Sequence, residues 1–216
     1  MKLEFDPHSN VYAYRKENDT EENNGDPAIV EGETRDVATI IIETAPIDIM
    51  PHSVHLFLEQ VSNGLYDGTA FHINAAHIVQ AGPSSLGGAA NSKFRHHPSL
   101  NSVVFQEYAP EMKHRKGTLG YHGRPGGPDF YVNMKDNSVT HGPGGQAHHF
   151  SDVVSDADPC FAKIVRGYEV MERVHLSKVK YQTTMAYPVT IVEMKVLPAD
   201  FALSDSGSLD DAEREQ

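Results

Sequence analysis

Short apolar runs separated by glycine and proline constrain the fold of this chain more than any other feature. They are rich in β-branched and aromatic residues, so each is expected to form a strand. They lie at 37–45, 70–73, 77–80, 103–106, 117–121, 129–133, 160–165 and 189–197. The pattern predicts a mainly β protein, a closed eight-stranded antiparallel barrel with long loops.

Two segments have helical spacing instead. Pro51 can open a helix because its missing N–H costs little at that position, and Gly64 can end it. After Pro51 apolar residues recur three and four positions apart, namely Val54, Phe57, Leu58, Val61 and Leu65. A second helix is expected from Tyr168 to about Leu176. The two helices are expected to cap the barrel.

Negative charge gathers at the two ends of the chain. The net charge is −12, and the acidic side chains are densest in 1–36 and 199–216. We therefore expect an acidic, largely flexible extension over 1–35 with a short strand near 10–14, a folded domain over 36–198 and a disordered acidic tail over 199–216. The acidic balance argues against binding to nucleic acid, which requires a basic surface.

Cysteine content and hydropathy restrict the class of protein further. The single cysteine, Cys160, lies in an apolar run and is expected to be a core residue, not a nucleophile. No apolar run approaches the roughly 20 residues needed to span a bilayer. No signal peptide is visible after Met1. A soluble chain is expected, and it could be a fragment of a longer protein; the sequence does not indicate a compartment or an oligomeric state.

Three segments resemble the cyclophilin family in the order in which that family has them. The first is VATIIIETAPIDIMPHSVHLFLEQVSNGLYDGTAFH, the second GTLGYHGRPGGPDFYVN and the third CFAKIVRGYEVMERV. Together they extend the resemblance over about residues 37–197. It implies a cyclophilin-like barrel and peptidyl-prolyl cis-trans isomerase activity, with a proline-containing peptide or protein as partner and no cofactor.

The resemblance fails at the residue that matters most for catalysis. The family has an arginine after Phe-His, whereas Ile73 follows Phe71 and His72 in this chain. The barrier of about 18–20 kcal/mol to prolyl rotation comes from amide resonance, and a donor near the proline nitrogen favours the twisted amide. Without that donor the isomerase activity is expected to be weak or lost. Arg124 and His122 are candidate surrogates for it.

The resemblance also implies a peptide-binding groove. Gln80 matches the pocket glutamine, Asp129 replaces a second glutamine, Tyr131 replaces the phenylalanine of the proline floor, and Asp158 falls near a groove histidine. The full set of implied peptide-binding residues is Phe71, His72, Ile78, Val79, Gln80, Tyr121, His122, Gly123, Asp129, Phe130 and Tyr131. A groove altered at so many places predicts a peptide-binding module more than an efficient isomerase.

The 13 histidines leave a second hypothesis open. Neutral imidazoles, alone or with a carboxylate such as Asp129, could bind Zn²⁺ or Cu²⁺. The candidates are His72, His122, His141, His148 and His149, although no spaced metal-binding motif is present. The alternatives to a peptide-binding module are thus a metal-binding or repurposed enzyme, and a non-catalytic subunit of an assembly.

Overall fold

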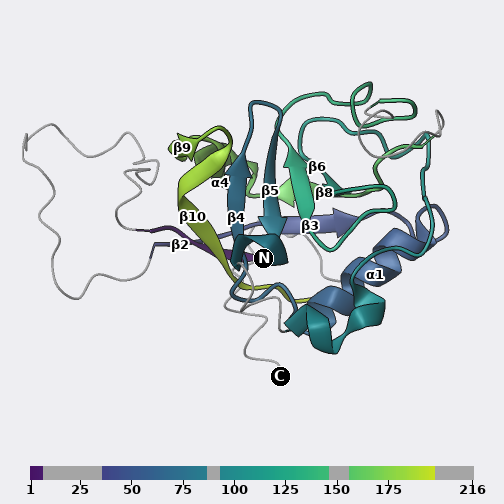
Figure 1. Cartoon of the computed structure of the whole chain (residues 1–216), viewed down its shortest axis with the longest axis horizontal. Helices are drawn as coiled ribbons and strands as arrows, with labels where there is room; N and C mark the ends of the chain where they lie inside the picture. Colours follow the sequence, from purple (N-terminus) through teal and green to yellow (C-terminus); the bar gives the residue numbers. More distant parts are fainter. Residues whose placement is uncertain (7–35, 87–92, 146–155, 198–216) are drawn as a thin grey trace, which may run out of the picture.

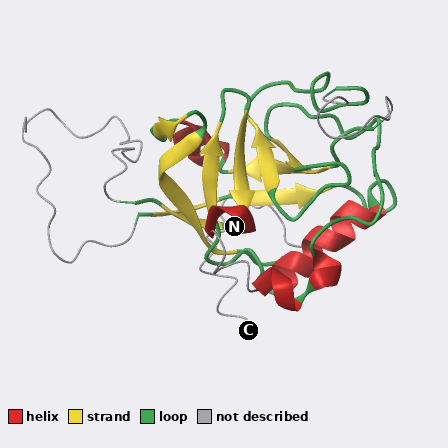
Figure 2. Cartoon of the chain, in the orientation of Figure 1, coloured by secondary structure: helices red, strands yellow, loops and turns green. Residues whose placement is uncertain are grey.

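The computed structural model describes residues 1–6, 36–86, 93–145 and 156–197, and strands fill its centre (Figure 2). The strands are β1 (Lys2–Glu4), β2 (Val37–Thr39), β3 (Ile41–Thr44), β4 (Ala70–Asn74), β5 (Ile78–Gly82), β6 (Thr118–Tyr121), β7 (Phe130–Asn133), β8 (Cys160–Arg166), β9 (Val179–Tyr181) and β10 (Thr184–Glu193).

The strands form one antiparallel sheet that curls into a nearly closed barrel. Its order is β2-β1-β10-β4-β5-β7-β6-β8-β3, and β9 pairs with β10 beside this path. The first and last strands, β2 and β3, are separated in sequence only by Ile40. The Ile40 N–H donates to the Met1 carbonyl oxygen at 2.9 Å, which ties this junction to β1. The expected mainly β antiparallel barrel is confirmed.

The number of strands differs from the eight expected, and the N-terminus is the first reason. Residues 1–6 are expected to belong to the flexible extension, but β1 pairs with both β10 and β2. Leu3 and Phe5 point into the core and are 0% and 2% exposed. The alternation of apolar and polar residues over so short a stretch did not stand out within an acidic segment. The strand expected near 10–14 and the acidic tail over 199–216 lie outside the described residues.

Among the described residues, β9 and the division of 37–45 into β2 and β3 at Ile40 also raise the number, whereas the expected run 103–106 forms no strand. Its polar groups bond to other loops instead of a neighbouring strand. The Val103 N–H donates to the Gly126 carbonyl oxygen at 3.0 Å, and the Gln106 amide donates to the Ala157 carbonyl oxygen. The Glu107 carboxylate then accepts hydrogen bonds from the backbone at the start of the helix that begins at Pro51. These long-range bonds override the strand propensity of the apolar residues.

Two α-helices cap the sheet as expected. Helix α1 (Pro51–Ser62) begins at Pro51 and buries Val54, Phe57 and Val61. Helix α4 (Tyr168–His175) buries Met171 and Val174. Figure 1 shows α1 below the strands and α4 near β9 and β10. Short 3-10 turns lie at η2 (Pro83–Leu86) and η3 (Pro98–Leu100). Within the described ranges, no helix has the length and hydropathy needed to cross a membrane.

Aromatic rings fill the interior of the barrel. The Phe57 ring packs against Phe161 with centroids 4.8 Å apart, and Tyr121 stacks on Phe161 at 4.4 Å. Cys160 is 1% exposed. Burial raises the pKa of its thiol to about 12, so the thiol is not an activated nucleophile. This agrees with its expected place in the core.

Candidate functional site

The strands β4, β5 and β7 carry a second face that points away from the core. Side chains alternate along a strand, so Val79, Ala81, Phe130 and Val132 join the hydrophobic core. Their neighbours point outward. We call this set the outer face; it consists of Ile73, Ile78, Gln80, Tyr131 and Asn133.

The residues expected to bind a peptide fall on both sides of the sheet. Phe71, Val79, Tyr121 and Phe130 are fully buried in the core, so they support the outer face from behind and do not lie on it. Only one of them has a polar role, since the Tyr121 hydroxyl donates to Gln60 Oε1 at 2.7 Å.

The remaining expected residues lie on or around the outer face. Ile78 and Gln80 are 8% and 9% exposed. His72 and Gly123 are partly exposed, and His122 is exposed. Asp129 immediately precedes β7 and is 5% exposed.

Ile73 lies directly across from Gln80 in the β4–β5 ladder. Its hydrocarbon side chain is partly exposed and can donate no hydrogen bond. Gln80 in turn donates from Nε2 to Asp129 Oδ2 at 3.2 Å, and the Ser84 N–H donates to Asp129 Oδ1 at 3.1 Å. The centre of the outer face is therefore an apolar side chain beside an amide held by a carboxylate.

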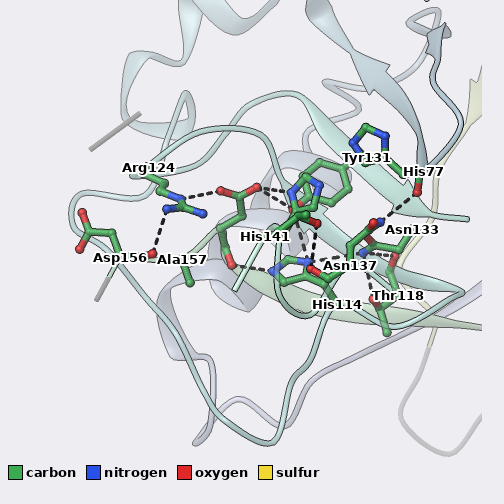
Figure 3. Close-up of polar contacts among 12 residues, drawn as sticks. His77, His114, Thr118, Arg124, Tyr131, Asn133, Asn137, His141, Asp156 and Ala157 are labelled. Carbon is green, nitrogen blue, oxygen red and sulfur yellow. Dashed lines mark hydrogen bonds and ion pairs between the residues drawn. The ribbon is translucent and has the colours of Figure 1, made fainter. Parts of the chain in front are cut away.

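Tyr131 is covered by residues from distant loops. Its side chain is 0% exposed although it points away from the core. The His141 ring lies 4.8 Å and the His114 ring 5.9 Å from the Tyr131 ring, centroid to centroid. The Tyr131 hydroxyl donates to Asp158 Oδ2 at 2.9 Å. Figure 3 shows Tyr131 among these side chains. In this structure the Tyr131 ring is thus closed to a ligand.

Asp158 binds three side chains at once. Arg124 Nε lies 2.8 Å from Oδ1, and His141 Nδ1 and the Tyr131 hydroxyl lie 2.6 and 2.9 Å from Oδ2. Burial acts to raise the pKa of Asp158, but hydrogen bonds from His141 and Arg124 outweigh it and lower the pKa. A carboxylate with such partners stays ionised well below neutral pH.

Arg124, a candidate surrogate donor, is buried and bound on the other side of the network. Its side chain is 0% exposed, and Nη1 donates to the Asp156 carbonyl oxygen at 2.9 Å in addition to the Asp158 pair. Figure 3 shows Arg124 at the end of the network farthest from His77. The guanidinium therefore belongs to the interior network and not to the outer face.

His114 is a member of this network that its sequence context does not reveal. Its Nε2 lies 2.9 Å from the Asp158 carbonyl oxygen, and it is 1% exposed. Burial lowers its pKa to about 4 despite the nearby Asp158. His77 lies 5.5 Å from His141 between ring centroids, and burial lowers its pKa as well. The lowered pKa values favour neutral imidazoles at His114 and His77 at physiological pH.

The metal hypothesis finds no support in the described part of the chain. No group of three or more histidine, cysteine or acidic side chains in it is arranged to hold a metal ion. His141 is paired with Asp158, and its distances to the neighbouring rings are packing contacts. His148 and His149 lie outside the described residues.

The barrel order, the two capping helices and the outer face of β4, β5 and β7 define a cyclophilin-like barrel protein. The chain belongs to the cyclophilin type peptidyl-prolyl cis-trans isomerase/CLD family, whose model matches residues 30–196. This confirms the family expected from the sequence.

Individual relatives agree with this assignment. The chain is 27% identical over 158 residues to peptidyl-prolyl cis-trans isomerase A of Dickeya dadantii (strain 3937), which covers 68% of this chain and 74% of that protein. A cyclophilin type isomerase of Cryptosporidium parvum, solved in the presence of the dipeptide Ala-Pro, has a TM-score of 0.54 at 17% identity. That match covers 71% of this chain and 89% of the other. A second structure of the same protein matches with the same TM-score and 88% of its length. At this identity the two structures indicate the fold alone.

Proposed function

We propose that this protein is a cyclophilin-family peptide-binding module that binds an extended peptide on the outer face and has weak or no isomerase activity. The observation that carries the proposal is the position of Ile73 directly across the strands from Gln80. A hydrocarbon there replaces the donor that the family resemblance requires beside the prolyl nitrogen.

Two features support binding of a peptide without efficient turnover. Ile73 and Ile78 offer apolar contact, and Gln80 offers polar atoms for a peptide backbone. The ring of Tyr131, which the resemblance assigns to the proline floor, is covered by His141. A proline ring would have to displace that histidine to reach it.

The absence of the donor determines how fast this protein is expected to catalyse prolyl isomerisation. Removing one donor aimed at a transition state typically costs about 10²–10³ in rate. Arg124 cannot restore it, because its buried side chain is bound to Asp158. Uncatalysed prolyl exchange takes tens of seconds. The rate of prolyl exchange in the presence of this protein is therefore expected to lie close to the uncatalysed rate.

NMR exchange spectroscopy on acetyl-Ala-Ala-Pro-Ala amide tests the catalytic half of the proposal. Wild-type protein should leave the exchange rate near its uncatalysed value, and Ile73→Arg should raise it if only the donor is missing. Ile73→Leu is the matched control, since it keeps an apolar side chain of equal size. Wild-type turnover equal to that of an ordinary family member would show that Ile73 is no obstacle.

Titration of ¹⁵N-labelled protein with the same peptide tests the binding half. Chemical shift changes should concentrate at Ile73, Ile78 and Gln80 and saturate at millimolar peptide or below. An unchanged spectrum with this peptide and with acetyl-Ala-Leu-Ala-Leu-Ala amide would refute peptide binding on the outer face.

One surface feature favours a second candidate function, that of a non-catalytic subunit of an assembly. Val104 and Phe105 are 88% and 52% exposed on a loop anchored by Glu107, and Tyr108 is 37% exposed. Neighbouring exposed apolar residues are typical of interaction surfaces. To test this function, wild-type protein and Val104→Ser are each isolated from the native source. The two sets of proteins that co-purify with them are then compared. Identical sets of co-purifying proteins would speak against it.

A further inference from the structure

A buried carboxylate orients the central amide of the outer face. Asp129 is 5% exposed, and both of its oxygens accept hydrogen bonds from the β5–η2 segment. Gln80 Nε2 donates to Oδ2 at 3.2 Å and the Ser84 N–H donates to Oδ1 at 3.1 Å. A carboxylate that receives two donors can only accept, so the nitrogen end of the Gln80 amide must face it.

The backbone around Asp129 is shaped for this contact. Gly82 has a φ of +135°, a conformation that other residues rarely adopt. A Cβ on Gly82 would collide with Asp129 Oδ1 and lie 2.8 Å from its Cα. Gln80, at the centre of β5, reaches the carboxylate with its side-chain amide, and Ser84, in the η2 turn, reaches it with its backbone N–H. The local backbone thus holds the Asp129 carboxylate close to Gln80.

Fixing the nitrogen of Gln80 also fixes its oxygen. Oε1 points away from Asp129, and the described residues provide no hydrogen-bond partner for it. It is also not among the buried polar atoms that lack a partner, so it retains access to solvent. Beside it lies Ile73, which has no polar side-chain atom. The outer face therefore presents a hydrogen-bond acceptor at its centre.

We propose that Asp129 is a positioning residue that turns the Gln80 carbonyl oxygen toward the bound peptide, where it accepts a backbone N–H. This inference rests on the proposed peptide-binding function and narrows its ligand. Proline has no backbone N–H. The site thus selects an extended peptide with a residue other than proline opposite Gln80.

The orientation of the amide can be measured without any peptide. In ¹⁵N-labelled wild-type protein, one Gln80 side-chain amide proton should be shifted downfield and exchange at least tenfold more slowly than its partner. Asp129→Ala should abolish this difference. Asp48→Asn, which neutralises an exposed carboxylate elsewhere, is the control and should leave it intact. Equal exchange rates of the two Gln80 amide protons in the wild type would overturn the positioning role.

Recognition of the N–H is tested by a methylation scan. The probe is acetyl-Ala-Leu-Ala-Leu-Ala amide, compared with versions that carry one N-methyl group at each position in turn. In the wild type, one of these methyl groups should weaken binding at least tenfold. Gln80→Met, which keeps the length of the side chain but not its amide, should bind the parent peptide more weakly and lose that discrimination.

The two ideas fail in different ways. Equal binding of the parent and of every methylated peptide would overturn the inference and leave the peptide-binding function standing. If neither the parent nor any methylated peptide binds at millimolar concentration, the proposed function fails and N–H recognition fails with it. If Asp129→Ala, which removes the acceptor, keeps the discrimination in full, Gln80 is oriented by something other than Asp129 and the positioning role is refuted.

Discussion

Arg124 and Asp158 form a buried ion pair, with Nε 2.8 Å from Oδ1 and side chains 0% and 3% exposed. Two loops that are far apart in the sequence are joined by this contact. The same carboxylate binds His141 and Tyr131, so the pair anchors the cluster that covers the Tyr131 ring.

Removing the cation should be strongly destabilising. Arg124→Met would leave Asp158 buried with one partner fewer, and breaking a buried pair typically costs about 3–5 kcal/mol. Urea unfolding at pH 7 measures this loss. Lys116→Met, in the exposed pair with Glu172, should have a much smaller effect, because solvent screens that pair. A loss for Arg124→Met as small as that of Lys116→Met would show that the buried pair contributes little.

His114 should make the protein less stable in mild acid. Its pKa is about 4 in the folded protein, whereas the unfolded chain takes up the proton below about 6.5. The unfolded state therefore binds more protons between these values, and the free energy of unfolding falls by about 3 kcal/mol as the pH drops through this window.

Urea midpoints at pH 7, 6 and 5 measure that dependence. His114→Gln should flatten it, although His77 and His175 retain a dependence of the same sign because burial also lowers their pKa values. The lowered pKa of Asp158 acts only below about 4, outside this range. A variant as pH-dependent as the wild type would rule out His114 as the main source.

Glu107 should contribute to the stability of helix α1. Its carboxylate oxygens accept the N–H groups of His52 at 2.9 Å and Ser53 at 2.7 Å, which have no partner within the helix. Glu107→Ala should cost about 1–2 kcal/mol in urea unfolding. The exposed Glu111 is the control, and its change to alanine should fall within about 0.5 kcal/mol of the wild type. Equal effects of the two changes would contradict the capping role.

Gly120 should be intolerant of a methyl group. A Cβ there would lie 2.8 Å from the Tyr131 hydroxyl and 2.9 Å from His114 Cε1. Gly120→Ala should therefore cost about 1–3 kcal/mol and shift the His114 ring resonances in NMR spectra. Gly68→Ala, where nothing lies within 4 Å, should leave those resonances unchanged. Undisturbed His114 resonances in Gly120→Ala would show that the cluster adapts.

The strands and helices follow from local patterns in the sequence. Apolar residues at spacings of three and four around Phe57 predicted helix α1, and Pro51 predicted its first residue. The runs that became β4 to β8 were recognisable because each is short, apolar and bounded by turn residues. These signals are local, since a strand or a helix needs only the right period over a few residues.

The errors arose where long-range contacts outweighed local propensity. The run 103–106 has the composition of a strand, but its backbone bonds to Gly126 and forms a loop. Lys2–Glu4 has little local signal, yet it forms β1 because β2 and β10 offer it partners on both sides.

The sequence by itself predicted the class of barrel and its family, and it placed Ile73 directly after Phe71 and His72. Only the tertiary structure decided what surrounds that position. Arg124 and Asp158 are 34 residues apart, and Gln80 and Asp129 are 49 apart. No local spacing connects such residues, because the strands and loops that carry them meet only when the sheet closes. The partners of Ile73 and Tyr131 therefore had to be read from the folded barrel.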